Sequence, residues 1–134
     1  FVDCCPAGLP NVLYATLADI GGFCPCIAGK RVTCTYDAAL GVWYGSIATT
    51  GTCSAGDVLN VRLECEGSGS GWRVVYYCSA DPTTVVPTDG TADDATTTSF
   101  TCNPLSFSAV DDLQGGCCDT FPSSDIVRWD VSQT

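Results

Sequence analysis

The feature that most constrains this chain is a two-residue alternation of apolar and polar side chains. It is clearest between residues 58 and 66, where every second position is apolar: Leu59, Val61, Leu63 and Cys65. Successive side chains of a β-strand point to opposite faces, so this period predicts strands with one buried face. No window of useful length shows the apolar spacing of an amphipathic helix. The sequence therefore predicts an all-β protein.

The same alternation predicts seven or eight strands along the 134 residues, which we treat as one domain spanning 1–134. Strands are expected at residues 12–20, 30–37, 42–49, 58–66, 72–79 and 126–132, with further extended segments at 100–102 and 105–109. Turns are expected at residues 38–41 and at Asp111-Asp112, and a long Thr/Asp-rich loop at 80–99. Strands without intervening helices form antiparallel sheets. We expect a disulfide-stabilised sandwich of two sheets, Ig-like or Greek-key, with a small β-barrel as the alternative.

Cysteine makes up about 8% of the chain, near the level that marks a disulfide scaffold. Cys34, Cys65 and Cys78 fall on the apolar faces of their strands, where they can join sheets through the core. The alternative is that Cys24-Pro25-Cys26 and the two Cys-Cys pairs hold zinc or an iron–sulfur cluster, although the Cys-x-x-Cys spacing that zinc sites favour does not occur. All 11 are disulfide candidates: Cys4, Cys5, Cys24, Cys26, Cys34, Cys53, Cys65, Cys78, Cys102, Cys117 and Cys118.

An odd number of cysteines leaves at least one sulfur without a partner inside the chain. The vicinal pairs Cys4-Cys5 and Cys117-Cys118 each reach two different partners, because the ring that two adjacent cysteines would close is strained. One of these sulfurs can reach a neighbouring molecule. The apolar, Cys-bearing stretch 1–10 is accordingly expected to be an arm that docks on another copy.

Composition excludes several classes of function. The chain has no His, which removes the Ser-His-Asp triad and His-ligated zinc. Five Lys and Arg against 15 Asp and Glu give a net charge of −10, which argues against a nucleic-acid partner. No apolar run reaches the length of a membrane span. The chain has no Met and begins at Phe1, which together with the cysteines predicts export after removal of a signal peptide.

Three weaker patterns suggest ligands or modifications. Asp89, Asp93 and Asp94 can supply oxygens to Ca²⁺, although their spacing is not that of an EF-hand, and no other cofactor is expected. Trp43 and Tyr77 are expected to face outward, where they can stack on sugars. The Ser and Thr residues of 83–101 can carry O-linked glycans.

The two glutamates of the chain, Glu64 and Glu66, lie on the outward face of one expected strand. A pair of carboxylates can hydrolyse glycosides when the two flank a sugar. Solvated charges on a strand edge are the simpler interpretation, and no enzymatic activity is expected.

Several short motifs suggest a family likeness that covers most of the chain. They are Cys4-Cys5, Cys24-Pro25-Cys26, residues 33–37 (TCTYD), residues 41–46 (GVWYGS), residues 104–107 (PLSF) and Gly116-Cys117-Cys118. In these the chain resembles uncharacterised Cys-rich β domains in secreted proteins of planctomycete-like bacteria. The resemblance implies export and a β fold, and no catalytic or binding residue carries over from it.

These observations together predict a non-enzymatic structural subunit, secreted and associated with the cell surface. Sheet edges that accept a strand from a neighbour favour self-association into a homopolymer such as a filament, sheath or surface layer. A carbohydrate-binding or adhesion module is the alternative.

Overall fold

The computed structural model describes residues 10–19, 26–53, 56–66, 71–82, 93–102, 104–113 and 125–134. Within these ranges the chain forms nine strands: β1 Val12–Asp19, β2 Arg31–Asp37, β3 Val42–Cys53, β4 Gly56–Glu66, β5 Gly71–Ser79, β6 Asp93–Thr97, β7 Phe100–Cys102, β8 Leu105–Leu113 and β9 Asp125–Ser132. The described part of the chain contains no helix, so the all-β prediction is confirmed. None of its elements is a helix long and apolar enough to cross a membrane.

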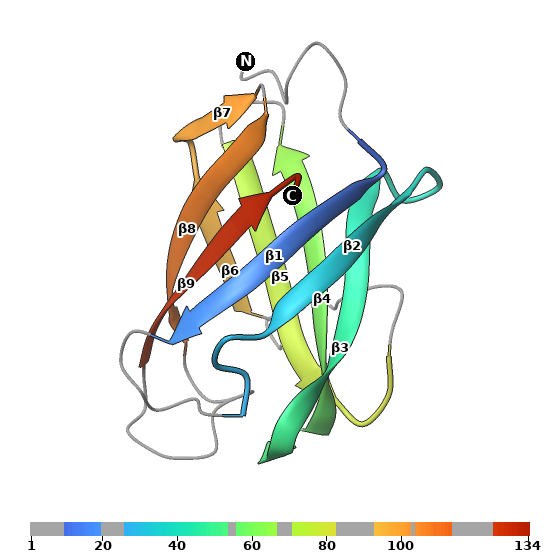
Figure 1. Cartoon of the computed structure of the whole chain (residues 1–134), viewed down its shortest axis with the longest axis vertical. Coiled ribbons are helices and arrows are strands. Elements are labelled where there is room, and N and C mark those ends of the chain that lie inside the picture. The colour runs from blue at the N-terminus through green and yellow to red at the C-terminus, as the bar shows by residue number, and fades with distance from the viewer. Residues whose placement is uncertain are drawn as a thin grey trace.

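The strands form one antiparallel sheet in the order β6-β5-β4-β3-β2-β1-β9-β8-β7. β6 and β7 stand at opposite ends of this order, yet only Thr98 and Ser99 separate them in sequence. The sheet must therefore curl until its two ends meet, and β6 does lie beside β8. Figure 1 shows the result, in which β8, β9, β1 and β2 cross in front of β4, β5 and β6.

This architecture is a nearly closed barrel rather than the two-sheet sandwich that the sequence favoured, and it matches the alternative. The sandwich and the barrel share the same local alternation, because both bury one face of every strand. They differ in whether one sheet is continuous. Here the pairing of β1 with both β2 and β9 keeps it continuous.

Inward side chains fill the barrel with apolar atoms. Leu13, Ala15 and Leu17 of β1 and Val127, Trp129 and Val131 of β9 are all at most 1% exposed. Rings from opposite walls touch: Trp72 of β5 stacks on Phe107 of β8 at 5.4 Å between ring centroids. Such contacts between strands far apart in the sheet hold the two walls together.

Two local predictions were wrong. Within the expected loop at 80–99, β6 pairs with β5 and buries Ala95, while residues 83–92 lie outside the described residues. Asp111 and Asp112, expected in a turn, lie within β8 and pair with β9. In both cases acidic residues, which favour turns, occupy strand positions that cross-strand pairing stabilises.

The β2–β3 connection at residues 38–41 is the expected turn. The Oδ1 of Asp37 accepts hydrogen bonds from the backbone N–H groups of Ala39 (2.9 Å) and Leu40 (3.2 Å). Gly41 has φ +70°, a conformation that glycine adopts without strain. This turn fixes the β2–β3 register, which places Tyr36 opposite Trp43.

Candidate functional site

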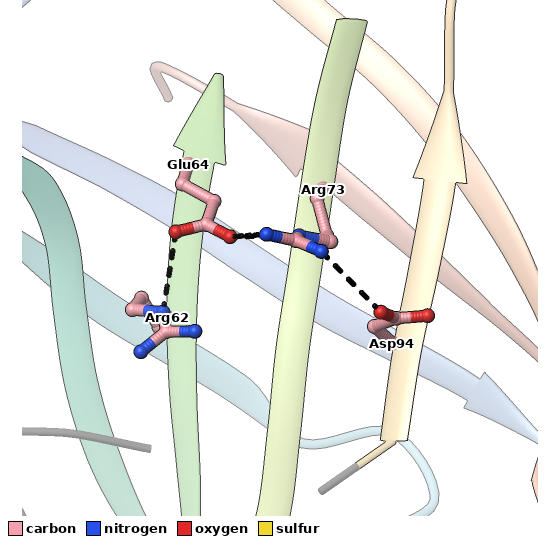
Figure 2. Close-up of polar contacts among 4 residues, drawn as sticks. All are labelled: Arg62, Glu64, Arg73 and Asp94. Carbon is pink, nitrogen blue, oxygen red and sulfur yellow. Dashed lines mark hydrogen bonds and ion pairs between the residues drawn. The ribbon is translucent and has the colours of Figure 1, made fainter. Parts of the chain in front are cut away.

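The densest group of charged side chains lies on the outer face of β4, β5 and β6. Figure 2 shows Arg62 and Glu64 of β4, Arg73 of β5 and Asp94 of β6, and we call these four residues the charge network. Glu64 is directly opposite Arg73 in the sheet. The pairing of β4 with β5 begins at Glu66 and Gly71 and continues residue by residue along both strands. The hairpin register therefore builds the centre of this group.

Both carboxylate oxygens of Glu64 are engaged by arginines. Arg73 donates from Nε to Oε1 at 2.7 Å and forms an ion pair with the same oxygen through Nη2. The Oε2 of Glu64 lies 3.4 Å from Nε of Arg62, and Nη1 of Arg73 lies 3.6 Å from Asp94. Two guanidinium groups thus neutralise two carboxylates. A carboxylate held in this way ties strands together and has no free oxygen to act as a base.

The side chains of the charge network are more deeply buried than the sequence indicated. The side chains of Arg62 and Glu64 are only 8% and 18% exposed, and β4 is an inner strand of the sheet. The expectation that Glu64 is a solvated charge on a strand edge was therefore wrong. The side chain of Glu66 lies outside the described residues.

Next to the charge network, a chain of polar groups crosses β3, β4 and β5. The Oγ of Ser46 donates to Oδ1 of Asn60 at 2.7 Å, and Nδ2 of Asn60 donates to Oγ of Ser79 at 2.9 Å. The hydroxyl of Tyr44 lies 3.1 Å from Oγ of Ser46. Asn60 is fully buried, so these bonds compensate for its loss of water. Alternation alone placed Asn60 on an outer face and gave no sign of this burial.

The aromatic side chains that were expected to bind sugars take different positions. Trp43 is 9% exposed, packs against Trp72 and Tyr36, and donates its indole N–H to the carbonyl oxygen of Pro10 at 3.0 Å. The prediction that Trp43 faces outward was therefore wrong. Tyr77 does lie on the outer face, opposite Asn60, and is half-buried.

The suggested calcium ligands are not brought together within the described residues. Asp94 is bound to Arg73, only the backbone of Asp93 is described, and Asp89 lies outside the described residues. Over the ranges that the structure describes, no three His, Cys, Asp or Glu side chains form a group suited to a metal ion.

Cysteines occupy the interior as their alternation predicted. Cys34 is fully buried, Cys78 is 4% exposed, and Cys65 packs against the core. Four cysteines, Cys26, Cys65, Cys78 and Cys102, are disulfide-bonded, whereas Cys34 is a free thiol. Cys34 was thus wrongly expected to bridge. Cys53 belongs to β3, while the candidates outside the described residues are Cys4, Cys5, Cys24, Cys117 and Cys118.

Burial raises the pKa of the Cys34 thiol from 9.0 to about 12. The cause is desolvation, because a thiolate inside an apolar core loses its hydration. The thiol donates weakly to the carbonyl oxygen of Val32 at 3.9 Å. A protonated, enclosed sulfur of this kind is a poor nucleophile and a poor metal ligand.

Comparison with known proteins adds no relative to this description. No protein-family model, no curated protein and no solved structure matches the chain.

Proposed function

We propose that the protein is a structural, non-catalytic subunit of an extracellular bacterial assembly, such as a filament, sheath or surface layer. The observation that carries the proposal is that aromatic side chains from different strands contact one another inside the barrel. Trp43, Trp72 and Phe107 form a continuous series of ring contacts from β3 through β5 to β8. Tyr76 and Trp129 make a second contact between β5 and β9, with ring centroids 5.2 Å apart. A barrel filled in this way is a rigid body suited to bearing load.

The state of the cysteines supports an extracellular location. Disulfides persist in oxidising compartments and are rare in the cytosol. Four described cysteines are in disulfide bonds, and each such bond contributes about 2–4 kcal/mol to a folded domain. The protein is therefore suited to conditions outside the cell, where chaperones do not refold damaged chains.

Subunits have to meet through an exposed surface. Val110 of β8 and Ile126 of β9 are 56% and 43% exposed, and both lie on the outer face of the barrel. They are diagonal neighbours, because Val110 pairs with Arg128 and Ile126 pairs with Asp112. The Arg128–Asp130 ion pair provides a polar rim beside them. An apolar centre with a polar rim is the usual anatomy of a protein interface, and we assign this pair to contact with a second copy.

The free cysteine changes how the copies are held together. The odd number of cysteines suggested a sulfur that bonds to a neighbour, but Cys34 is free and buried within the barrel. Cys34 itself therefore cannot bond to another molecule. We propose non-covalent subunit contacts as the main connection, with the stretch 1–10 as a second one.

Negative-stain electron microscopy of the native, disulfide-intact protein tests the proposal, together with gels run with and without reductant. We expect regular polymers in the microscope and a monomer band on both SDS gels, because SDS disrupts non-covalent contacts. Particles of monomer size at every concentration would reject the assembly. A ladder on the non-reducing gel alone would reject the non-covalent connection while keeping the assembly.

A further inference from the structure

A second outer surface of the barrel differs in chemistry from the Val110 and Ile126 pair. It lies across β2, β1, β9, β8 and β7, whose outward side chains form rows that run across the strands, and it is two rows away from Val110 along β8. One row consists of hydroxyl groups placed by the strand pairing: Thr33, Tyr14, Ser132, Ser106 and Thr101. Neighbouring strands are about 4.8 Å apart, so the row is roughly 19 Å long. We call this surface the hydroxyl face.

An arginine lies at one end of the hydroxyl face. Arg31 is the residue diagonal to Tyr14, and its guanidinium carbon lies 4.4 Å from the centroid of the Tyr14 ring. This cation–π contact holds the guanidinium plane in place while Arg31 stays exposed. The other three arginines of the chain form ion pairs with carboxylates. Among the described residues, no carboxylate forms an ion pair with Arg31.

Several hydroxyls of this face are equally available. The hydroxyls of Tyr14, Thr33 and Ser106 make no hydrogen bond within the part of the chain that the structure describes. Within the described ranges, Ser132 and Thr101 donate to backbone carbonyl oxygens, which leaves their own oxygens able to accept. The face therefore offers a fixed planar donor group next to a line of groups that both donate and accept.

From this arrangement we propose that the hydroxyl face binds a neutral polysaccharide, with Arg31 and Tyr14 as its main contacts at one end of the site. A guanidinium fork donates two parallel hydrogen bonds, which suits the adjacent hydroxyls of a sugar ring. A row of Thr and Ser hydroxyls suits an extended chain of sugars. The net charge of −10 disfavours an anionic polymer, and the apolar anchors that protein interfaces use are missing from the row.

This site is separate from the surface that carries the proposed function. Val110 lies two rows away from Ser106 along β8. It is also distinct from Trp43 and Tyr77, the sugar-binding candidates of the sequence, since neither belongs to the hydroxyl face. Loss of polysaccharide binding and loss of assembly can therefore be produced by different substitutions and measured separately.

The test is affinity electrophoresis of the native protein in gels containing mixed-linkage β-glucan, galactomannan or hydroxyethylcellulose, with pull-down on insoluble cellulose and chitin in 0.5 M NaCl. We expect retention by at least one of these polymers. Arg31→Ala should weaken it at least tenfold, and Arg31→Lys should weaken it similarly, because lysine keeps the charge but loses the planar fork. Thr33→Ala should weaken it severalfold.

Thr96→Ala is the matched control, because Thr96 is exposed on the outer face of β6, on the other wall of the barrel. It should bind as the unmodified protein does, and sedimentation should show the same assembly for all four variants. The proposal is overturned by no retention on any of the five polymers. It is also overturned if Arg31→Ala binds normally, or if only the anionic polymer polygalacturonate retains the protein.

Discussion

The hydroxyl of Tyr76 on β5 donates a 2.6 Å hydrogen bond to Oδ2 of Asp111 on β8. The two residues are 35 positions apart in sequence and lie on walls of the barrel that are not paired with each other. Tyr76 is fully buried, so this bond compensates its hydroxyl for lost contact with water. The bond joins the two walls on either side of the gap in the barrel, where β6 runs beside β8.

Replacing Tyr76 by Phe should lower the free energy of unfolding by about 1–3 kcal/mol, because this hydrogen bond to a charged group is lost. Urea unfolding followed by tryptophan fluorescence measures the change. Asp111→Asn, made both in the unmodified protein and in the Tyr76→Phe variant, completes a double-mutant cycle. It should lower the free energy of unfolding less in the Tyr76→Phe variant than in the unmodified protein. Equal costs in the two backgrounds would show that the two residues do not interact.

The charge network should stabilise the barrel more than an exposed ion pair does. Arg73→Ala removes both contacts with Oε1 of Glu64 and the contact with Asp94. We expect a loss of about 1–3 kcal/mol, since Glu64 then keeps a charge that is largely shielded from water. Arg128→Ala is the matched control, because the Arg128–Asp130 pair is 45% and 43% exposed. It should cost at most about 1 kcal/mol. Similar losses for the two variants in chemical denaturation would contradict this account of the charge network.

Gly45 of β3 lies close against the backbone of Thr33 on β2. A Cβ on this residue would overlap the backbone carbonyl oxygen of Thr33, which cannot move without disturbing the sheet. Gly45→Ala should therefore cost more than about 2 kcal/mol. At Gly41, φ is +70° and a Cβ would meet nothing within 4 Å, so Gly41→Ala should cost only about 1 kcal/mol. Thermal unfolding compares the two, and a larger loss at Gly41 would show that the close approach at Gly45 is wrong.

Cys34 makes stability depend on alkaline pH. Its thiol has an ordinary pKa of 9.0 when the chain is unfolded and a pKa of about 12 in the barrel. Between these values the unfolded chain has lost a proton that the folded protein keeps, so stability is fully present below pH 9 and falls as pH rises toward 12. The slope reaches about 1.4 kcal/mol per pH unit. Cys34→Ala should lower stability at neutral pH and remove this slope.

Urea titrations between pH 8 and 10.5 on the disulfide-intact protein measure this slope. Alkylation by iodoacetamide at pH 8, mapped by mass spectrometry, provides an independent check. Cys34 should stay unmodified in buffer and react in urea. Rapid alkylation of Cys34 in buffer would show that the thiol is accessible.

Local sequence patterns were enough to identify most strands. Alternation marked the paired strands at 58–66 and 72–79, and the turn expected at 38–41 marked the hairpin before them. β6 was missed because Asp and Thr surround its one buried residue, Ala95, so it lacks an apolar face. The choice between sandwich and barrel depends on contacts between strands far apart in the chain, which no local pattern contains.

The sites were harder to predict than the strands. Each face of residues 42–49 mixes apolar with small or polar side chains, so alternation did not decide which way Trp43 points. The opposition of Glu64 and Arg73 was available in principle, because an evenly paired hairpin around residues 67–70 places them together. Burial of Cys34 followed from alternation, but its free state depends on where the other sulfurs lie.

The central claim is that rigid barrels associate through Val110 and Ile126. Sedimentation velocity of the native protein over a wide concentration range tests it most directly, with Ile126→Asp as the variant and Thr96→Asp, on the other wall, as the control. We predict polymers that grow with concentration. The dissociation constant for assembly should be at least tenfold higher for Ile126→Asp and unchanged for the Thr96→Asp control. A single monomeric species at all concentrations, or equal assembly of all three proteins, would contradict the claim.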